Sequence, residues 1–348
     1  MSGLLKYSGI VSKIRAMNSK ALKEADYLTI AQCGSVLDVI AFLKAHPAYT
    51  LAFADLDERL LHRGDVEKIL IHSLYTDYSK LYRFGNVHVR DFLLFYLRRY
   101  EIDLINYCFR IVFNHYAEPF DLSHKRAFFD TYSNISIDKL ITSNDAHELV
   151  ESLAGTEYYA PLKHLEDMTG ASLYDYNLAL ELYYYSTLWK QRKKYLTKQE
   201  LPIFTNEIGY KIDLLNLQWI YRSKKYYTMQ SSEIYALLIP ANYHLHKNQM
   251  KELVESATLE DFIKLAYETY YGKRFASDTN LSLEEMYRDC LQHCYAKDCR
   301  HYPYSLAPIN MYLHHKETEI KKIITALECI RYGIDSTEIS QYIGGIAQ

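Results

Sequence analysis

The stretch Tyr210-Lys211-Ile212-Asp213-Leu214-Leu215-Asn216 places an acid and an amide among apolar residues, in a segment without glycine or proline from Tyr210 to Ile239. Similar words occur earlier as Tyr100-Glu101-Ile102-Asp103-Leu104-Ile105-Asn106 and, more faintly, later as Lys316-Glu317-Thr318-Glu319-Ile320-Lys321-Lys322. Asp103 to Asp213 is a step of 110 residues, and Asp213 to Glu319 is a step of 106. Because a nearly constant period is typical of repeated structural units, the sequence predicts three copies of one unit.

Two further motifs repeat with the same period. A short apolar segment that follows a serine and an acid recurs in steps of 110 and 112 residues, measured at Leu43, Leu153 and Leu265. A tyrosine-rich helical pattern with basic residues at its end recurs in two steps of 110, over 65–83, 175–193 and 285–300. Basic residues favour a helix C-terminus through its dipole. The order of short helix, tyrosine-rich helix and acid-bearing long helix therefore runs three times.

The repeat predicts three helical units of about 110 residues, over 1–118, 119–240 and 241–348. Linkers are expected near Glu118-Pro119 and Pro240-Ala241-Asn242, where proline and turn residues interrupt the helical pattern. The first unit is expected to begin with one amphipathic helix over Met1–Ala31. Glycine (12) and proline (7) are scarce in the 348 residues, and no useful alternating β-pattern occurs, so the predicted fold class is all-α.

Composition excludes several classes of protein. A formal net charge of -3 argues against a general nucleic-acid binder, which would normally be basic. Six cysteines lack the paired density of a secreted disulfide scaffold, and the N-terminus lacks the continuous apolar core of a secretory signal. No stretch approaches the ~18 to 20 apolar residues that cross a bilayer. The chain is expected to be cytosolic, or held at a membrane only through a partner.

The repeated acids are the candidate functional residues. In the first copy, helical spacing from Val89 to Ile111 places Asp103 on a stripe of aromatic residues, where a carboxylate needs a hydrogen-bond partner. Asn106, one turn on, is a candidate partner for it or for a neighbouring unit. The acids could be catalytic, could dock a partner protein, or could accept hydrogen bonds from backbone groups and tyrosines where units meet. The last interpretation is preferred because equivalent positions in three repeats are rarely all catalytic. The candidate inter-unit or partner-docking residues are Asp103, Asn106, Asp213, Asn216, Arg222 and Glu319.

The sequence indicates no metal or nucleotide site. Cys290, Cys294 and Cys299 lack the CxxC knuckle of structural zinc sites. The segment His147-Glu148-Leu149-Val150-Glu151 begins like a zinc-protease motif but has glutamate where the second histidine is required, so it is interpreted as a solvated helix face. No P-loop, GxGxxG after a strand, or GxSxG occurs. No metal, cofactor or catalytic residue is predicted.

Several segments in order resemble one known family. Ile212-Asp213-Leu214-Leu215-Asn216-Leu217, with Arg222 and the run from Ser232 to Pro240, looks like the middle of the C subunit of bacterial V-type and archaeal A-type ATPases, whose eukaryotic V-ATPase counterpart is called the d subunit. The run from Tyr302 to Ile334 resembles that family's ending, and Tyr7 with Lys13-Ile14-Arg15-Ala16-Met17 resembles its opening. Ala241 stands where the family often has glycine, and Lys322 stands where the other two repeats have asparagine.

The resemblance implies a funnel of three similar helical units around a pseudo-three-fold axis. It implies a non-catalytic rotor adaptor on the cytoplasmic face of the membrane, which links central-stalk subunits of the D and F type to the membrane rotor ring, built of the c or K type. Such an adaptor transmits torque between ATP chemistry and transport of H+ or Na+, and touches the membrane only through the ring. The alternative from the residues alone is a helical-repeat scaffold that binds proteins, although common solenoids have periods of about 34 to 47 residues.

Overall fold

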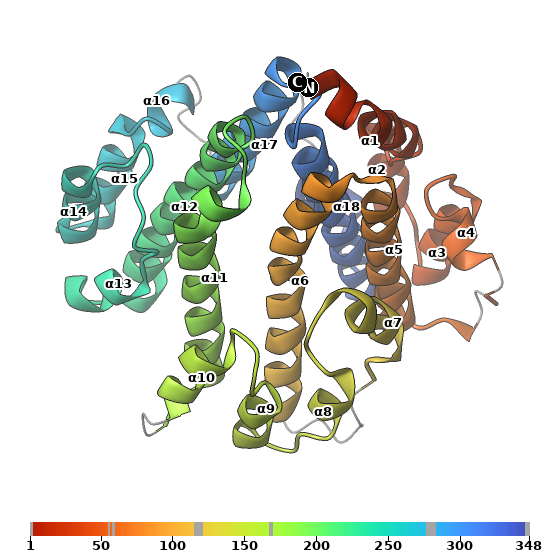
Figure 1. Cartoon of the computed structure of the whole chain (residues 1–348), viewed down its shortest axis with the longest axis horizontal. Coiled ribbons are helices and arrows are strands. Elements are labelled where there is room, and N and C mark those ends of the chain that lie inside the picture. Colours follow the sequence, from red (N-terminus) through yellow and green to blue (C-terminus); the bar gives the residue numbers. More distant parts are fainter. Residues whose placement is uncertain are drawn as a thin grey trace. The chain divides into compact units, whose positions relative to one another are not determined.

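The computed structural model describes residues 3–54, 56–57, 60–114, 121–166, 170–275 and 283–344, which form helices and no strand (Figure 1). They contain nineteen α-helices and one π-helix, so the all-α prediction is confirmed. The first six helices are α1 (Gly3–Asn18), α2 (Glu24–Ala31), α3 (Val36–Ala45), α4 (Thr50–Phe53), α5 (Arg63–Phe84) and α6 (Val87–Phe113). The next six are α7 (Ser123–Tyr132), α8 (Ile137–Ile141), α9 (Ala146–Ser152), α10 (Tyr159–Glu166), α11 (Leu173–Tyr195) and α12 (Leu201–Arg222), continued by the π-helix η2 (Ser223–Tyr227). The remaining helices are α13 (Ser231–Leu237), α14 (Lys247–Glu255), α15 (Leu259–Glu268), α16 (Gly272–Phe275), α17 (Leu283–His301), α18 (Ala307–Arg331) and α19 (Ser336–Ile343).

The order of helices along the chain repeats. In each run of six, four shorter helices precede two long ones, and the long pairs are α5 with α6, α11 with α12, and α17 with α18. The three predicted tyrosine-rich helices are confirmed as α5, α11 and α17. The pseudo-three-fold arrangement of three units, with their boundaries after residues 118 and 240, stays a prediction.

Local signals fix several helix ends. Ser35 caps α3 by accepting a hydrogen bond from the N–H of Asp38, and α3 ends at Ala45, two residues before Pro47. The corresponding caps are Asp145 for α9 and Thr258 for α15. The segment around Pro240 is irregular, as predicted, and Glu118-Pro119 lies outside the described residues.

The prediction of one helix over Met1–Ala31 is wrong. Helix α1 ends at Asn18 and α2 begins at Glu24. The backbone N–H of Leu22, in the break between them, donates a hydrogen bond to Glu319 Oε2 at 3.0 Å. That acceptor lies 297 residues away in sequence, so helical periodicity could not have revealed the break.

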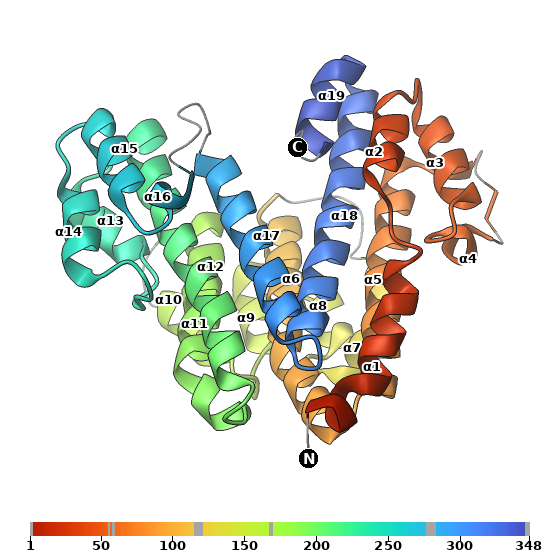
Figure 2. The same cartoon turned by 90° about the horizontal axis from the view of Figure 1, so that it is seen from above.

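By its packing the chain divides into two compact units. One comprises residues 1–90, 122–128 and 308–348, and thus joins the beginning of the chain to its end. In it α1 packs on α5, and α2 packs on α19. Helices α5 and α18 lie side by side (Figures 1 and 2), held by an ion pair of 2.6 Å between Arg63 and Glu328. Phe128 fills the core of this unit, where its ring stacks on Tyr75 at 4.2 Å.

The other unit comprises residues 91–121 and 129–307. Helix α12 is its centre, because it packs on both α11 and α17, and twelve of its 22 residues are buried. The ring of Phe204 on α12 meets those of Phe92 and Phe95 on α6 at 6.0 and 5.6 Å. A helix buried on most of its surface needs partners for each polar group that it carries.

Candidate functional site: buried carboxylates on the long helices

Asp213 on α12 is wholly buried and accepts four hydrogen bonds. Three come from the consecutive backbone N–H groups of Tyr243, His244 and Leu245, at 3.1, 2.6 and 2.9 Å. The fourth comes from the hydroxyl of Tyr271 at 2.9 Å. The carboxylate therefore supplies the acceptors that the irregular, partly buried segment between α13 and α14 cannot find in a helix or sheet.

Gly209 allows Tyr243 to pack closely against α12. A methyl group on its Cα would lie 2.4 Å from Cγ of Tyr243, so only glycine leaves room for that ring against α12. Gly209 lies one turn before Asp213, on the same side of the helix. The Tyr243 ring thus packs on α12 at a place where the backbone N–H of Tyr243 can donate to Asp213.

Asn216, one turn further along α12, also binds the segment between α13 and α14. Its Nδ2 donates to the carbonyl of Ile239 at 3.1 Å, and its Oδ1 accepts from the N–H of Ile239 at 2.9 Å. The Asn216 side chain therefore satisfies both the backbone N–H and the carbonyl of Ile239, a buried residue just before Pro240. Asp213 and Asn216 together hold the chain between α13 and α14 against α12.

Glu319 on α18 is buried in a similar network. Its Oε2 accepts from the N–H of Leu22, and its Oε1 accepts from the hydroxyl of Tyr49 at 2.6 Å and from Lys316 Nζ at 2.8 Å. Lys316 also donates to the Tyr49 hydroxyl at 2.9 Å, and its Nζ lies 4.1 Å from the centre of that ring. A buried ion pair needs such additional hydrogen bonds to offset its desolvation.

The prediction that Asp103 lies among aromatic residues is wrong. Its side chain is 52% exposed, and Arg99 lies 3.7 Å away as an ion-pair partner. The buried stripe of α6 continues from Tyr100 through Leu104 to Cys108 in steps of four residues, which turns position 103 to an exposed flank. The buried Oδ1 of Asn106 has no hydrogen-bond partner in the described part of the chain, so a partner for this side chain stays a prediction.

Glu101, two residues before Asp103, is the acid that α6 turns inward. It accepts hydrogen bonds from the hydroxyls of Ser133 and Tyr158, the latter at 2.6 Å. Sequence comparison missed it because the best alignment of the repeated words matches Asp103, not Glu101, with Asp213. The available signal was the tyrosine, which recurs at Tyr49, Tyr158 and Tyr271 in steps of 109 and 113 residues.

Three long helices thus carry one acid each that accepts a hydrogen bond from a buried tyrosine. The pairs are Glu101 with Tyr158, Asp213 with Tyr271, and Glu319 with Tyr49. Burial raises the pKa of all three phenols, and the neighbouring carboxylate raises it further, so the hydroxyls stay protonated and donate at neutral pH. Burial also raises the pKa of Glu101 and of Asp213, against the lowering effect of their hydrogen bonds. Acids whose oxygens already accept hydrogen bonds from protein donors are suited to holding segments together, not to attacking a substrate.

Arg222 lies elsewhere, at the end of α12. Its side chain is half exposed and its Nη2 is 3.6 Å from Glu284. The helix then widens into η2, and Thr228, the residue that follows η2, lies in the left-handed region (φ 47°). Tyr226 and Tyr227 on η2 are 61% and 71% exposed, so this helix end presents aromatic and basic side chains to the surface.

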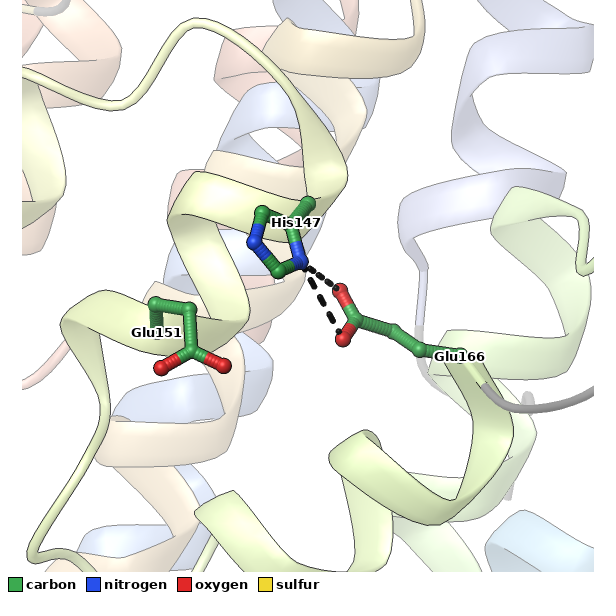
Figure 3. Close-up of side chains that lie close together, drawn as sticks. All are labelled: His147, Glu151 and Glu166. Atoms are coloured by element: carbon green, nitrogen blue, oxygen red, sulfur yellow. Dashed lines mark hydrogen bonds and ion pairs between the residues drawn. The ribbon is translucent and has the colours of Figure 1, made fainter.

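The segment that resembles a zinc-protease motif contributes to a small polar cluster. His147 and Glu151 on α9 and Glu166 on α10 have potential ligand atoms within 4.8 Å of one another (Figure 3). Lys163 Nζ already bridges the two carboxylates, at 2.9 Å from Glu151 and 2.8 Å from Glu166. His147 is 65% exposed. The lysine supplies the positive charge of this cluster, and an added metal ion would have to displace it.

The cysteines of α17 are thiols in a helix. Cys290 and Cys294 are buried, and burial raises the pKa of Cys290 to about 12. A raised pKa keeps a thiol protonated and disfavours its use as a nucleophile or metal ligand.

The fold and these junctions define an all-α protein whose long helices hold neighbouring segments through buried carboxylates. Residues 10–342 match the model of the ATP synthase (C/AC39) subunit family, and the chain belongs to that family. It is 28% identical to the C subunit of the A-type ATP synthase of Methanosarcina acetivorans, over 92% of this chain and 88% of the relative. The corresponding proteins of Methanosarcina mazei and Archaeoglobus fulgidus are 29% and 24% identical, over 77% and 95% of this chain and 72% and 94% of theirs. No helix in the described ranges combines the length and hydropathy needed to cross a membrane.

Proposed function

We propose that this chain is the rotor adaptor of a V/A-type rotary ATPase. It links the central stalk to the membrane rotor ring and transmits torque that couples ATP chemistry to transport of H+ or Na+. The observation that carries the proposal is the family match, which extends over residues 10–342, together with relatives that are C subunits of A-type ATP synthases along most of their length.

In this proposal the chain catalyses no reaction. Support comes from the acids themselves, because Asp213 and Glu319 are buried and accept hydrogen bonds from backbone groups and tyrosines. A catalytic pocket needs unlike groups brought together around a reacting atom. Repeated carboxylate-tyrosine pairs instead stiffen the attachment of each long helix, which suits a part that must transmit force.

The same pairs support three units, with the proposed boundaries after residues 118 and 240. Glu101 of the first unit accepts from Tyr158 of the second, and Asp213 of the second accepts from Tyr271 of the third. Glu319 of the third accepts from Tyr49 of the first. Each hydrogen bond joins two different proposed units, and the three together link every unit to the other two, which supports an arrangement around a pseudo-three-fold axis.

The proposed partners are central-stalk subunits of the D and F type and a ring built of the c or K type, on the cytoplasmic face of the membrane. The chain meets the membrane only through the ring. Arg222 and the exposed tyrosines of η2 are proposed to contact an acidic surface of one partner, because aromatic and arginine side chains are enriched at interfaces.

The test is reconstitution of the ATPase complex in vesicles with and without this chain. ATP hydrolysis is measured together with H+ and Na+ uptake. Without the chain, hydrolysis should continue while ion uptake per ATP falls to background. If uptake per ATP is unchanged in its absence, the chain is not the coupling element.

A further inference from the structure

A cavity of about 620 Å³ opens in the compact unit that holds both ends of the chain. It lies among α1, α5, the turn between α3 and α4, and α18. This volume lies within the range of about 300–1,000 Å³ that is usual for small-molecule sites. The candidate functional residues of the long helices touch it only at Glu319.

The cavity wall carries more positive than negative side chains. Four lysines line it against two acids, Asp77 and Glu319. Both acids are already engaged, because Asp77 accepts from the Tyr312 hydroxyl at 2.6 Å and pairs with Lys80 at 2.9 Å. Glu319 accepts from Leu22, Tyr49 and Lys316, as described above. Each acid is therefore already paired with a lysine of the same wall, Asp77 with Lys80 and Glu319 with Lys316.

The lysines retain donors for a ligand. Lys13 Nζ lies 4.8 Å from the centre of the Phe84 ring, and neither Lys13 nor Lys20 pairs with a carboxylate among the described residues. Lys316 is only 7% exposed, and its two hydrogen bonds leave a third N–H of the ammonium. Lysines line the cavity at different depths, from the exposed Lys20 to the buried Lys316.

The rest of the wall combines polar side chains, such as those of Ser73 and Thr76 on α5, with an apolar part. Ala16 and Met17 contribute to it from α1, and Ala48, Leu51 and Ala52 from the segment around α4. Leu51 is 89% exposed, so its side chain stands at the surface beside the cavity. A ligand that fits these walls has an anionic group and an apolar body.

We propose that this cavity binds a small phosphate ester with an apolar substituent. The phosphate would be held by Lys13, Lys20 and Lys316, since several ammonium groups around one site suit a dianion better than a single carboxylate. The site shares Lys316 and Glu319 with the Tyr49 network, but the proposal does not depend on the proposed coupling role.

The first experiment titrates the intact chain with phenyl phosphate by isothermal calorimetry in low salt. Saturable binding with one site per chain is expected, at least fivefold weaker for benzoate and absent for benzyl alcohol. Binding should weaken as NaCl is raised, because the exposed Lys20 is screened. Absence of saturable binding by phenyl phosphate would overturn the proposal.

Two sets of variants locate the site. The double variant Lys13→Gln/Lys20→Gln should bind at least tenfold more weakly, whereas the matched Lys247→Gln/Lys251→Gln on α14 should stay within twofold of wild type. Ala52→Trp should abolish binding by filling the cavity while every charge remains, and Ala48→Trp replaces it if circular dichroism shows that Ala52→Trp is unfolded. If a folded tryptophan variant binds normally, the phosphate sits outside the cavity and the proposal fails.

A third arm separates a free phosphate ester from a lipid headgroup. Phosphatidic acid vesicles and phosphatidylcholine vesicles are sedimented with the chain. Weak or equal sedimentation with both supports a soluble ligand. Sedimentation with phosphatidic acid alone, lost in Lys13→Gln/Lys20→Gln while phenyl phosphate fails to bind, would assign the lysines to a membrane surface and overturn the small-molecule site.

Discussion

Asp213 has more hydrogen-bond donors around it than any other acid described above, and replacing it with alanine should be costly. Asp213→Ala would leave three backbone N–H groups and the Tyr271 hydroxyl without their acceptor in a buried place. We expect the free energy of unfolding to fall by about 3–5 kcal/mol, since each unsatisfied buried donor costs about 1–3 kcal/mol before relaxation. Urea denaturation of the isolated chain, followed by circular dichroism, measures this.

Asp103→Ala is the matched control, because Asp103 occupies the same place in the repeated sequence word but is half exposed. It should change the free energy of unfolding by less than about 0.5 kcal/mol. Equal effects of the two substitutions would contradict the distinction between them. Unchanged stability of Asp213→Ala, together with weakened binding of central-stalk subunits, would instead make Asp213 a docking residue.

Glu101 supports a prediction about pH. Burial raises its pKa in the folded chain, so over the pH range just above the usual glutamate value the folded state binds more protons than the unfolded state. Its contribution to the free energy of unfolding is therefore largest at low pH and falls as pH rises through the raised pKa. Glu101→Gln removes this titration while its amide can still accept from Tyr158 and donate to Ser133.

The variant should therefore gain stability relative to wild type as pH rises from 4.5 towards 8. Urea denaturation of both proteins at each pH gives the difference, in which the titration of other groups cancels. Glu157→Gln serves as a control for loss of a nearby negative charge. Glu157 pairs with Arg98, so this variant loses the ion pair and should be less stable than wild type. A difference between Glu101→Gln and wild type that is constant with pH would show that folding does not raise the pKa of Glu101.

At the scale of the helix, position 209 of α12 is one where glycine should be more stable than alanine, although alanine is usually preferred in helices. Gly209→Ala improves helix propensity by up to about 1 kcal/mol, but the new methyl group would lie 2.4 and 2.7 Å from two ring atoms of Tyr243. The ring must move, and with it the N–H that reaches Asp213. We expect a net loss of about 1–3 kcal/mol in the free energy of unfolding, as for other overpacked sites.

The double variant Gly209→Ala/Tyr243→Ala tests the cause. Removing the ring should recover part of the loss that Gly209→Ala produces, relative to Tyr243→Ala alone. Gly9→Ala on α1 is the control, because a methyl group there meets nothing within 4 Å and should be neutral or stabilising. If Gly209→Ala is as stable as wild type, the close approach is not a constraint.

The same scale shows what the sequence can predict. The tyrosine-rich helices follow from periodicity within a few residues, and they were predicted correctly. The cap at Ser35 likewise follows from local capping chemistry. The break before α2 was not predicted, because its reason is a hydrogen bond from Leu22 to a carboxylate almost 300 residues away. Glu101 was missed for a related reason, since which flank of α6 faces a neighbour depends on helices that a local pattern does not contain.

Over the whole molecule, the repeat and the packing give different divisions of the chain. Sequence period groups consecutive residues into units, whereas one compact unit joins residues 1–90 to residues 308–348. Tyr49 and Leu22 bind Glu319 across this join, and Asp77 binds Tyr312. A period reveals copies of a structure, but it carries no information on which copies exchange hydrogen bonds.

This difference predicts the effect of truncation after Ala307, which removes α18 and α19. Five aliphatic side chains of α18 are buried, namely Ile309, Leu313, Ile320, Ile323 and Leu327. At about 1.5–3 kcal/mol each, their loss is comparable with the whole stability of a typical domain, about 5–15 kcal/mol. The hydrogen bonds of Glu319 and Tyr312 and the ion pair of Glu328 are lost with them.

Hydrogen exchange read by mass spectrometry should therefore show α1, α2 and α5 exchanging at least a hundredfold faster than in the full chain. The amides of α11, α12 and α17 should keep most of their protection and serve as the internal control, because their packing on one another does not include the removed helices. Full protection of α1 and α5 in the truncated chain would mean that residues 1–118 fold as an independent unit, as the sequence period alone predicts.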